Sequence, residues 1–127
     1  MKKLIMSGIV SLIILAISVP AFADTALFDF TLNPGQSGYS SFVHKADSEQ
    51  RAYVSITSSN FINSDKTWFR VRDSADNIKT ETKWANANIS FTLNYISTGY
   101  AGDYYRLKGQ QDSASPYYVH VAGRWTP

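Results

Sequence analysis

The chain has 127 residues, with 12 Lys and Arg, 10 Asp and Glu, no cysteine and a formal net charge of +2. This length suits a single domain. The lack of cysteine excludes a disulfide scaffold, a thiolate nucleophile and cysteine-ligated zinc or iron–sulfur clusters. Hydrophobic residues make up 44% of the chain and charged residues 17%, so it is not a disordered acidic or basic tail.

Residues 1–23 have the three-part pattern of a secretory signal peptide. The start is basic, residues 4–19 form an apolar run, and residues 21–23 (Ala-Phe-Ala) match the small-x-small cleavage pattern. The run of about 16 residues is shorter than the roughly 20 that a transmembrane helix needs. We therefore expect a signal peptide at 1–23, a secreted, extracellular domain at 24–127 and no membrane anchor after cleavage.

The positive net charge belongs to the predicted signal peptide. Lys2 and Lys3 are two of the 12 basic residues, and no acidic residue precedes position 24, so ten basic and ten acidic side chains remain in residues 24–127. A balanced domain has no overall electrostatic attraction for nucleic acid. We therefore expect no nucleic-acid partner.

Apolar residues alternate at a period of two along residues 24–127, without a helical period. The first predicted strand, residues 27–32, ends at the turn Asn33-Pro34-Gly35, where Pro favours the first corner and Gly the second. Later strands are predicted over residues 39–44, 52–57, 67–72, 78–84, 89–95, 104–108 and 117–121, the last one continuing toward Trp125. Polar turns are predicted at residues 47–50 and 73–77.

The alternation assigns side chains of two of these strands to opposite faces. In residues 67–72, the inward pair is Phe69 and Val71, and the other face carries Trp68, Arg70 and Arg72. In residues 78–84, the water-facing set is Lys79, Glu81 and Lys83, and the opposite set is Ile78, Thr80, Thr82 and Trp84.

About eight short strands with turn signals, and no connection long enough for a crossover helix, predict an all-β antiparallel sandwich or barrel. Of the two we expect a single jelly-roll-like β-sandwich. Its core must hold without disulfides. The predicted core residues are Phe28, Phe30, Phe42, Val54, Ile56, Phe69, Val71, Ile89, Phe91, Leu93, Leu107, Val119 and Val121.

Candidate catalytic and metal-binding groups are few. His44 and His120 lie in predicted strands, and no G-x-S-x-G motif accompanies them. Asp29 alternates with phenylalanines and is expected to face solvent. Residues 73–77 offer oxygen ligands for calcium but lack the EF-hand spacing, so a hairpin turn is the favoured interpretation. We expect no enzymatic activity, no catalytic residue, no metal site and no cofactor.

The most informative feature is the content of 8 Tyr, 7 Phe and 3 Trp. Tyr and Trp combine an apolar ring with a polar group. Beside Arg, Asn and Gln, such rings can stack on sugars or form a protein-binding surface. They are also good strand formers, an interpretation that needs no ligand. The candidate ligand-binding residues are Trp68, Arg70, Trp84, Tyr104, Tyr117 and Trp125.

Two stretches of the chain resemble small, uncharacterised secreted proteins of Bacillus and related Gram-positive bacteria. One follows the predicted signal peptide and reads Phe28-x-Phe30-x-Leu32-Asn33-Pro34-Gly35-Gln36-x-Gly38-Tyr39-Ser40. The other ends the chain and reads Tyr118-x-x-x-Ala122-Gly123-Arg124-Trp125-x-Pro127. The resemblance implies secretion and a compact β domain, and it implies no catalytic residue.

Three functions follow from these observations. The leading expectation is a secreted, non-enzymatic binding module whose aromatic and polar surface binds a cell-surface carbohydrate or a protein partner. The alternative is a secreted antagonist, either a bacteriocin-like toxin or an inhibitor, although a balanced charge does not favour cationic membrane lysis. A small hydrolase ranks last because no catalytic motif is present.

Overall fold

The computed structural model describes residues 25–62, 65–114 and 116–127, so the predicted signal peptide lies outside the described residues. Within these ranges the protein consists of nine strands and the loops between them, and no helix that could cross a membrane is found there. The strands are β1 (Ala26–Leu32), β2 (Ser37–Tyr39), β3 (Val43–His44), β4 (Arg51–Ser59), β5 (Thr67–Asp73), β6 (Lys83–Ala85), β7 (Ser90–Asn94), β8 (Tyr104–Gln111) and β9 (Val119–Thr126).

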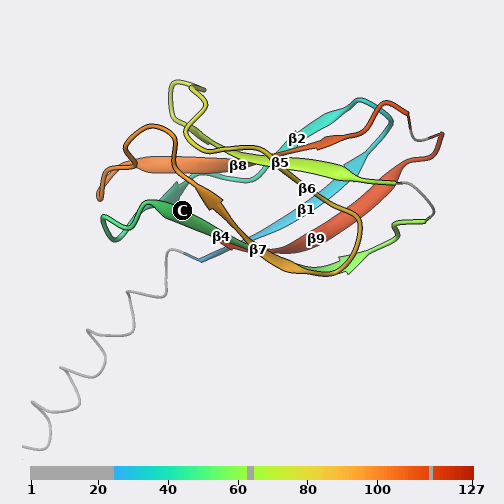
Figure 1. Ribbon diagram of the computed structural model, residues 1–127, viewed down its shortest axis with the longest axis horizontal. Helices are drawn as coiled ribbons and strands as arrows, with labels where there is room; N and C mark the ends of the chain where they lie inside the picture. Colours follow the sequence, from blue (N-terminus) through green and yellow to red (C-terminus); the bar gives the residue numbers. More distant parts are fainter. Residues whose placement is uncertain (1–24, 63–64, 115) are drawn as a thin grey trace, which may run out of the picture.

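The strands form two antiparallel sheets, stacked as two layers (Figure 1). Sheet A has the order β1-β9-β4-β7, and sheet B has the order β2-β8-β5-β6, with β3 also paired to β8. β2 and β3 both pair with β8 and can be counted as one interrupted strand, which leaves eight described strands in chain order. In that numbering, sheet A has the order 1-8-3-6 and sheet B has the order 2-7-4-5. This is the double Greek-key arrangement of a jelly roll. The predicted all-β, jelly-roll-like sandwich is confirmed.

Strand alternation places one side of each sheet in a shared core. In β5, Phe69 and Val71 are fully buried, as predicted. The predicted core is confirmed apart from three residues, since Phe91 is only partly buried and Phe42 and Ile89 are 44% and 43% exposed. The core also contains residues that were not predicted for it, namely Leu32, Val43, Ala52, Ala85, Tyr105 and Trp125.

The prediction of one strand over residues 39–44 is wrong because Ser40 interrupts it. Ser40 Oγ accepts a hydrogen bond from the Leu107 N–H at 2.9 Å, and so takes the place of a backbone carbonyl. Tyr39 pairs with Lys108, and Val43 pairs with Tyr105. Between these two pairs, the segment from Tyr39 to Val43 therefore contains one residue more than the opposing part of β8. The extra residue reverses the alternation, and Val43 rather than Phe42 enters the core.

The predicted strand at residues 78–84 is mostly a connection that crosses between the sheets. The Lys79 N–H donates to the Val71 carbonyl in sheet B at 2.9 Å, whereas the Glu81 N–H donates to the Asn94 carbonyl in sheet A at 3.0 Å. Only the short strand β6 is regular here. A segment that changes partner every two residues cannot keep one face toward the core.

The side-chain assignment in this segment is therefore wrong for three of four residues. Thr80 is buried, and its Oγ1 accepts a hydrogen bond from the Val71 N–H at 3.0 Å. Ile78 and Trp84 are 44% and 49% exposed, and Thr82 is exposed as well. The outward position of Trp84 makes its indole available at the surface of sheet B.

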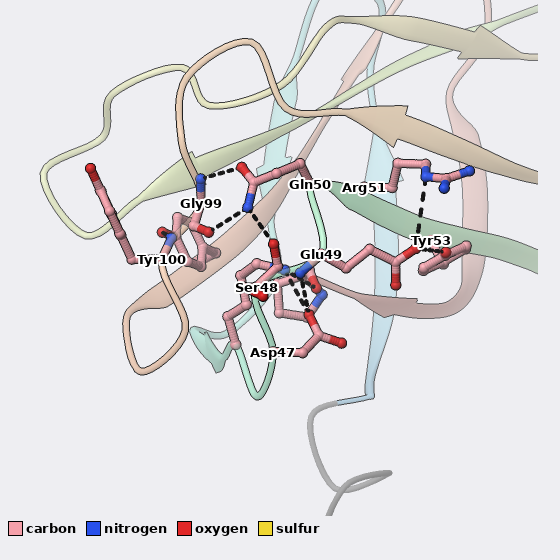
Figure 2. A network of polar contacts seen from close by, with 11 residues as sticks. Asp47, Ser48, Glu49, Gln50, Arg51, Tyr53, Gly99 and Tyr100 are labelled. Carbon is pink, nitrogen blue, oxygen red and sulfur yellow. Dashed lines mark hydrogen bonds and ion pairs between the residues drawn. The ribbon is translucent and has the colours of Figure 1, made fainter.

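At the end of the sandwich where β8 begins, a polar network ties two loops together (Figure 2). Gln50 Nε2 donates to the carbonyls of Ser48 and Gly99 at 2.7 and 2.8 Å, and Gln50 Oε1 accepts from the Gly99 N–H at 2.8 Å. Glu49 accepts a hydrogen bond from the Tyr53 hydroxyl beside them. The side chains in this turn are therefore satisfied within the fold.

Lys45 is a buried cation at the same end of the molecule. Its Nζ lies 3.1 Å from Asp47 Oδ1 and 3.3 Å from the Pro127 carbonyl, beside the C-terminus marked in Figure 1. The ammonium also lies 5.1 Å from the centroid of the Tyr95 ring, and burial raises the pKa of that tyrosine. Lys45 therefore has its partners within the fold.

Candidate ligand-binding site

The outward face of sheet B collects aromatic and basic side chains. Directly opposed residues of antiparallel strands share a face. Trp68 is opposed by Trp84 on one side and by Gln110 on the other, and Arg70 is opposed by Lys108. We call this surface the basic–aromatic face and define it as Tyr39, Trp68, Arg70, Arg72, Trp84, Arg106, Lys108 and Gln110.

A groove of about 330 Å³ lies at the end of this face where β8 ends. Strand β5 contributes Trp68 and Arg70 to it, and β8 contributes Gln110. The full lining is Gly35, Trp68, Arg70, Thr82, Gln110, Gln111, Asp112 and Ser113. One indole among amides, hydroxyls, a carboxylate and a guanidinium suits a ligand with one apolar face and many hydroxyl groups.

Lys66 lies above both indoles beside the groove. Its Nζ is 5.4 Å from the ring centroid of Trp68 and 5.5 Å from that of Trp84. The same ammonium lies 3.6 Å from Asp112 Oδ2. Cation–π attraction and this ion pair together link the two rings to the loop that follows β8.

The turn at Gly35 closes the groove on the other side. Gly35 has a φ of +77°, a conformation that a glycine adopts without strain, as predicted for the turn after β1. Its N–H donates to the Gln111 carbonyl at 3.1 Å, and the Gln111 N–H donates to the Gln36 carbonyl at 3.0 Å. These two backbone bonds fix the position of Gly35 against the end of β8.

Gln111 is a lining residue whose side-chain amide is buried. Its Oε1 accepts a hydrogen bond from Thr67 Oγ1 at 3.1 Å, and the side chain is 1% exposed. Its Nε2 has no hydrogen-bond partner among the described residues. A buried donor without a partner is destabilising.

Arg72 and Arg106 are opposed on the basic–aromatic face, beyond the groove. The Asp76 carboxylate compensates the charge of both guanidinium groups, because its Oδ1 lies 3.1 Å from Arg106 Nη2 and its Oδ2 lies 3.6 Å from Arg72 Nη1. Arg72 Nη1 also donates to the Asp76 carbonyl at 2.8 Å. Asp76 has a φ of +63°, so the turn presents it in a conformation that few residues other than Gly, Asn and Asp adopt.

Asp73 builds the turn that carries Asp76. Its Oδ1 accepts hydrogen bonds from the N–H groups of Ala75 at 3.0 Å and Asn77 at 2.8 Å. Burial acts to raise the pKa of Asp73, but the hydrogen bonds from Asn77 and Ala75 outweigh it and hold that pKa below its ordinary value. The predicted turn at residues 73–77 is thus held by a charged carboxylate.

Three of the six candidate ligand-binding residues lie together. Trp68 and Arg70 line the groove, and Trp84 is the cross-strand neighbour of Trp68. Tyr104 is on the outward side of β8 but six residues before Gln110, which corresponds to about 20 Å along a strand.

The other two candidates lie elsewhere. Tyr117 is 60% exposed in the loop before β9 and does not line the groove. Trp125 is 1% exposed and belongs to the core, so its selection as a surface residue is wrong. It continues the inward alternation of Val119 and Val121 along β9, which extends to Thr126.

Several lining residues were missed from the sequence. The strand predicted over residues 104–108 ends too early, and Gln110 was therefore not placed on the outward face. Asp112 and Ser113 lie in the loop that follows β8. If the predicted strand is extended by two residues, its alternation places Gln110 on the outward face. The loop positions have no such pattern.

The histidines do not join the groove. His120 Nε2 lies 2.7 Å from Asp29 Oδ1 on the outward side of sheet A, where Asp29 faces solvent as expected. The His44 ring is 5.5 Å from that of Tyr104. Across residues 25–62, 65–114 and 116–127, no three His, Asp or Glu side chains lie together in a way that suits a metal ion.

Comparison of the chain with protein-family models, curated proteins and solved structures finds no match. The functional interpretation therefore depends on the geometry of the groove and of the basic–aromatic face.

Proposed function

We propose that the protein is a secreted, non-enzymatic carbohydrate-binding module, and that it binds a saccharide in the groove beside Trp68. The observation that carries this proposal is the composition of the groove, in which one indole stands among closely spaced polar groups. Sugars present an apolar C–H face and a rim of hydroxyl groups, and this lining complements both.

In the proposed complex, the C–H face of one sugar ring stacks on the Trp68 indole. Hydroxyl groups on the rim of the sugar then exchange hydrogen bonds with the amide of Gln110, the carboxylate of Asp112 and the guanidinium of Arg70. The adjacent indole of Trp84 extends the aromatic surface and suits a second sugar residue. The Lys66 ammonium lies over both indoles and pairs with Asp112, so the stacked sugar takes the part of the Trp68 ring that Lys66 leaves uncovered.

A saccharide fits this site better than a folded protein partner. A stable protein–protein interface buries about 800 Å² on each side and is centred on an apolar cluster. The groove is small and lined mainly by polar side chains. These features favour a chain of a few sugar units over a protein surface.

The test is binding of the purified protein, residues 24–127, to a glycan array and to peptidoglycan in a pull-down. We expect retention of the native protein and its loss in Trp68→Ala. Tyr53→Ala is the matched control, because Tyr53 is an exposed aromatic residue on the outward side of sheet A and does not line the groove. Absence of binding to every glycan, or equal binding by Trp68→Ala, would overturn the proposal.

A further inference from the structure

Two pairs of like charges lie next to each other on the basic–aromatic face. Arg72 is directly opposite Arg106, and Arg70 is directly opposite Lys108, in the same β5–β8 ladder. Opposed residues of antiparallel strands have Cα atoms about 4.5–5.5 Å apart. Like charges at such positions destabilise the pairing unless an anion compensates them.

The first pair has its anion within the protein. The Asp76 carboxylate lies between the guanidinium groups of Arg72 and Arg106, at 3.6 and 3.1 Å. The β5–β6 connection therefore supplies one carboxylate to one pair of cations. This arrangement shows what a compensated pair looks like in this sheet.

The second pair has no such anion. The side chains of Arg70 and Lys108 form no hydrogen bond or ion pair with any described residue. Lys108 Nζ contacts only a ring face, 5.7 Å from the Tyr39 centroid, and the Arg106 guanidinium already lies 4.0 Å from the same ring. Arg70 lines the groove beside Trp68.

We propose that the saccharide bound by this module is acidic, and that its carboxylate or phosphate binds between Arg70 and Lys108. This inference rests on the proposed function of the groove and names the class of its ligand. The ligand anion takes the place that Asp76 occupies for the neighbouring pair. A guanidinium and an ammonium donate charge-assisted hydrogen bonds to such oxygens, while the sugar ring that carries them stacks on Trp68.

The acidic group is attracted locally rather than from a distance. Residues 24–127 contain equal numbers of acidic and basic side chains, so the domain as a whole has no attraction for polyanions. The uncompensated charge is confined to one cross-strand pair beside an indole. One anionic group per sugar unit fits this arrangement better than a continuous phosphate backbone does.

The experiment is calorimetric titration of the protein with a matched pair of ligands. One is an oligosaccharide of uronic acids, and the other is the same oligosaccharide with its carboxyl groups reduced to alcohols. A phosphodiester-linked polyol forms a third arm, which distinguishes phosphate from carboxylate. We expect at least one acidic ligand to bind about tenfold or more tightly than the reduced one, and this advantage to shrink as salt is raised.

The variant that tests the assignment is Arg70→Gln with Lys108→Gln. We expect it to lose the advantage of the acidic ligand and to keep the affinity for the reduced oligosaccharide. Arg124→Gln is the matched control, since it removes an exposed arginine from the outward side of sheet A. Because the double substitution removes a repulsion, we expect its denaturation midpoint to equal or exceed that of the native protein.

Each other outcome is decisive. If the reduced oligosaccharide binds as tightly as the acidic ones, the inference is wrong and the carbohydrate-binding function stands. If no saccharide binds, the proposed function fails and the inference fails with it. If a single-stranded oligonucleotide binds more tightly than either saccharide and depends on the same two residues, the site belongs to nucleic acid and the proposal is overturned.

Discussion

The outward faces of the two sheets are built by the same strand alternation and differ in how their polar groups are satisfied. On sheet A, short side chains pair with each other across strands, as in the 2.7 Å contact between the hydroxyls of Ser55 and Ser90 and the 2.7 Å contact between Asp29 and His120. On sheet B, long cations and indoles face solvent, and the Arg70–Lys108 pair has no counter-ion. The uncompensated Arg70–Lys108 pair is the basis of the ligand site proposed for sheet B.

The two sheets also differ in how much space they leave beside a glycine, and this gives the largest expected effect. A Cβ added at Gly123 in β9 would lie 1.9 Å from the Ser55 carbonyl oxygen, next to the irregular register of β4. A Cβ added at Gly109 in β8 would lie 2.7 Å from the Phe30 ring, which is a side chain. Backbone cannot rotate away, whereas a side chain adjusts in part.

We therefore expect Gly123→Ala to lower the free energy of unfolding by about 3 kcal/mol or more and Gly109→Ala by about 1–3 kcal/mol. Urea denaturation followed by tryptophan fluorescence measures both. Equal losses in the two variants would show that the sheets tolerate the added methyl group alike.

The aromatic residues of the two faces give the next comparison. We expect Trp84→Ala to weaken saccharide binding by about tenfold, because its indole extends the surface beside Trp68. Tyr53→Ala removes a comparably exposed ring from the outward side of sheet A, and we expect it to leave affinity unchanged. Titration of each variant with the same oligosaccharide measures the two affinities. A loss of affinity in Tyr53→Ala and none in Trp84→Ala would place the binding surface on sheet A instead.

Asp76→Asn would convert the compensated pair of cations into a second uncompensated pair. We expect a loss of about 0.5–1 kcal/mol in stability, since the ion pairs are partly exposed. We also expect a few-fold gain in affinity for the acidic oligosaccharide, because the neighbouring anion is gone. Denaturation and calorimetry at low salt measure the two effects, and an unchanged or lower affinity would contradict the role given to Asp76.

The smallest expected effect concerns pH and the Asp73 turn. The pKa of Asp73 is lowered in the folded protein, so its contribution to stability is present above the unfolded-state pKa and is lost as pH falls through the folded-state value. We expect Asp73→Asn to be less stable than the native protein by about 1 kcal/mol at pH 7 and to approach it as pH falls through the lowered folded-state pKa of Asp73. Denaturation midpoints across this range measure the difference, and a gap independent of pH would contradict this assignment.

The fold and half of the site were predictable from the sequence because both depend on local alternation. Residues 67–72 show Phe69 and Val71 opposite Trp68 and Arg70, and the structure keeps this arrangement. Phe42 was wrongly predicted to be in the core because the Ser40 side chain takes the place of a backbone hydrogen-bond acceptor and the inward–outward alternation reverses there. The hydrophobic pattern of the sequence does not show this reversal. Such an exchange depends on the partner strand.

The charge pairs were not predictable for a related reason. Arg70 and Lys108 are far apart in the chain, and only the register of β5 on β8 brings them face to face. Register depends on the whole sandwich, including the turn at Gly35 and the close approach at Gly123. By contrast, the burial of Trp125 does follow from the alternation of β9 once that strand is continued to its observed end.

The most direct test of the central claim is a titration of the isotope-labelled protein with the acidic oligosaccharide, followed by the backbone amide signals in NMR spectra. We expect the largest shifts in β5 and β8, at Trp68, Arg70, Lys108 and Gln110, with little change on the outward side of sheet A. Shifts centred on Asp29, Ser55 and Arg124 instead, or no shifts at all, would contradict the assignment of the ligand site to sheet B.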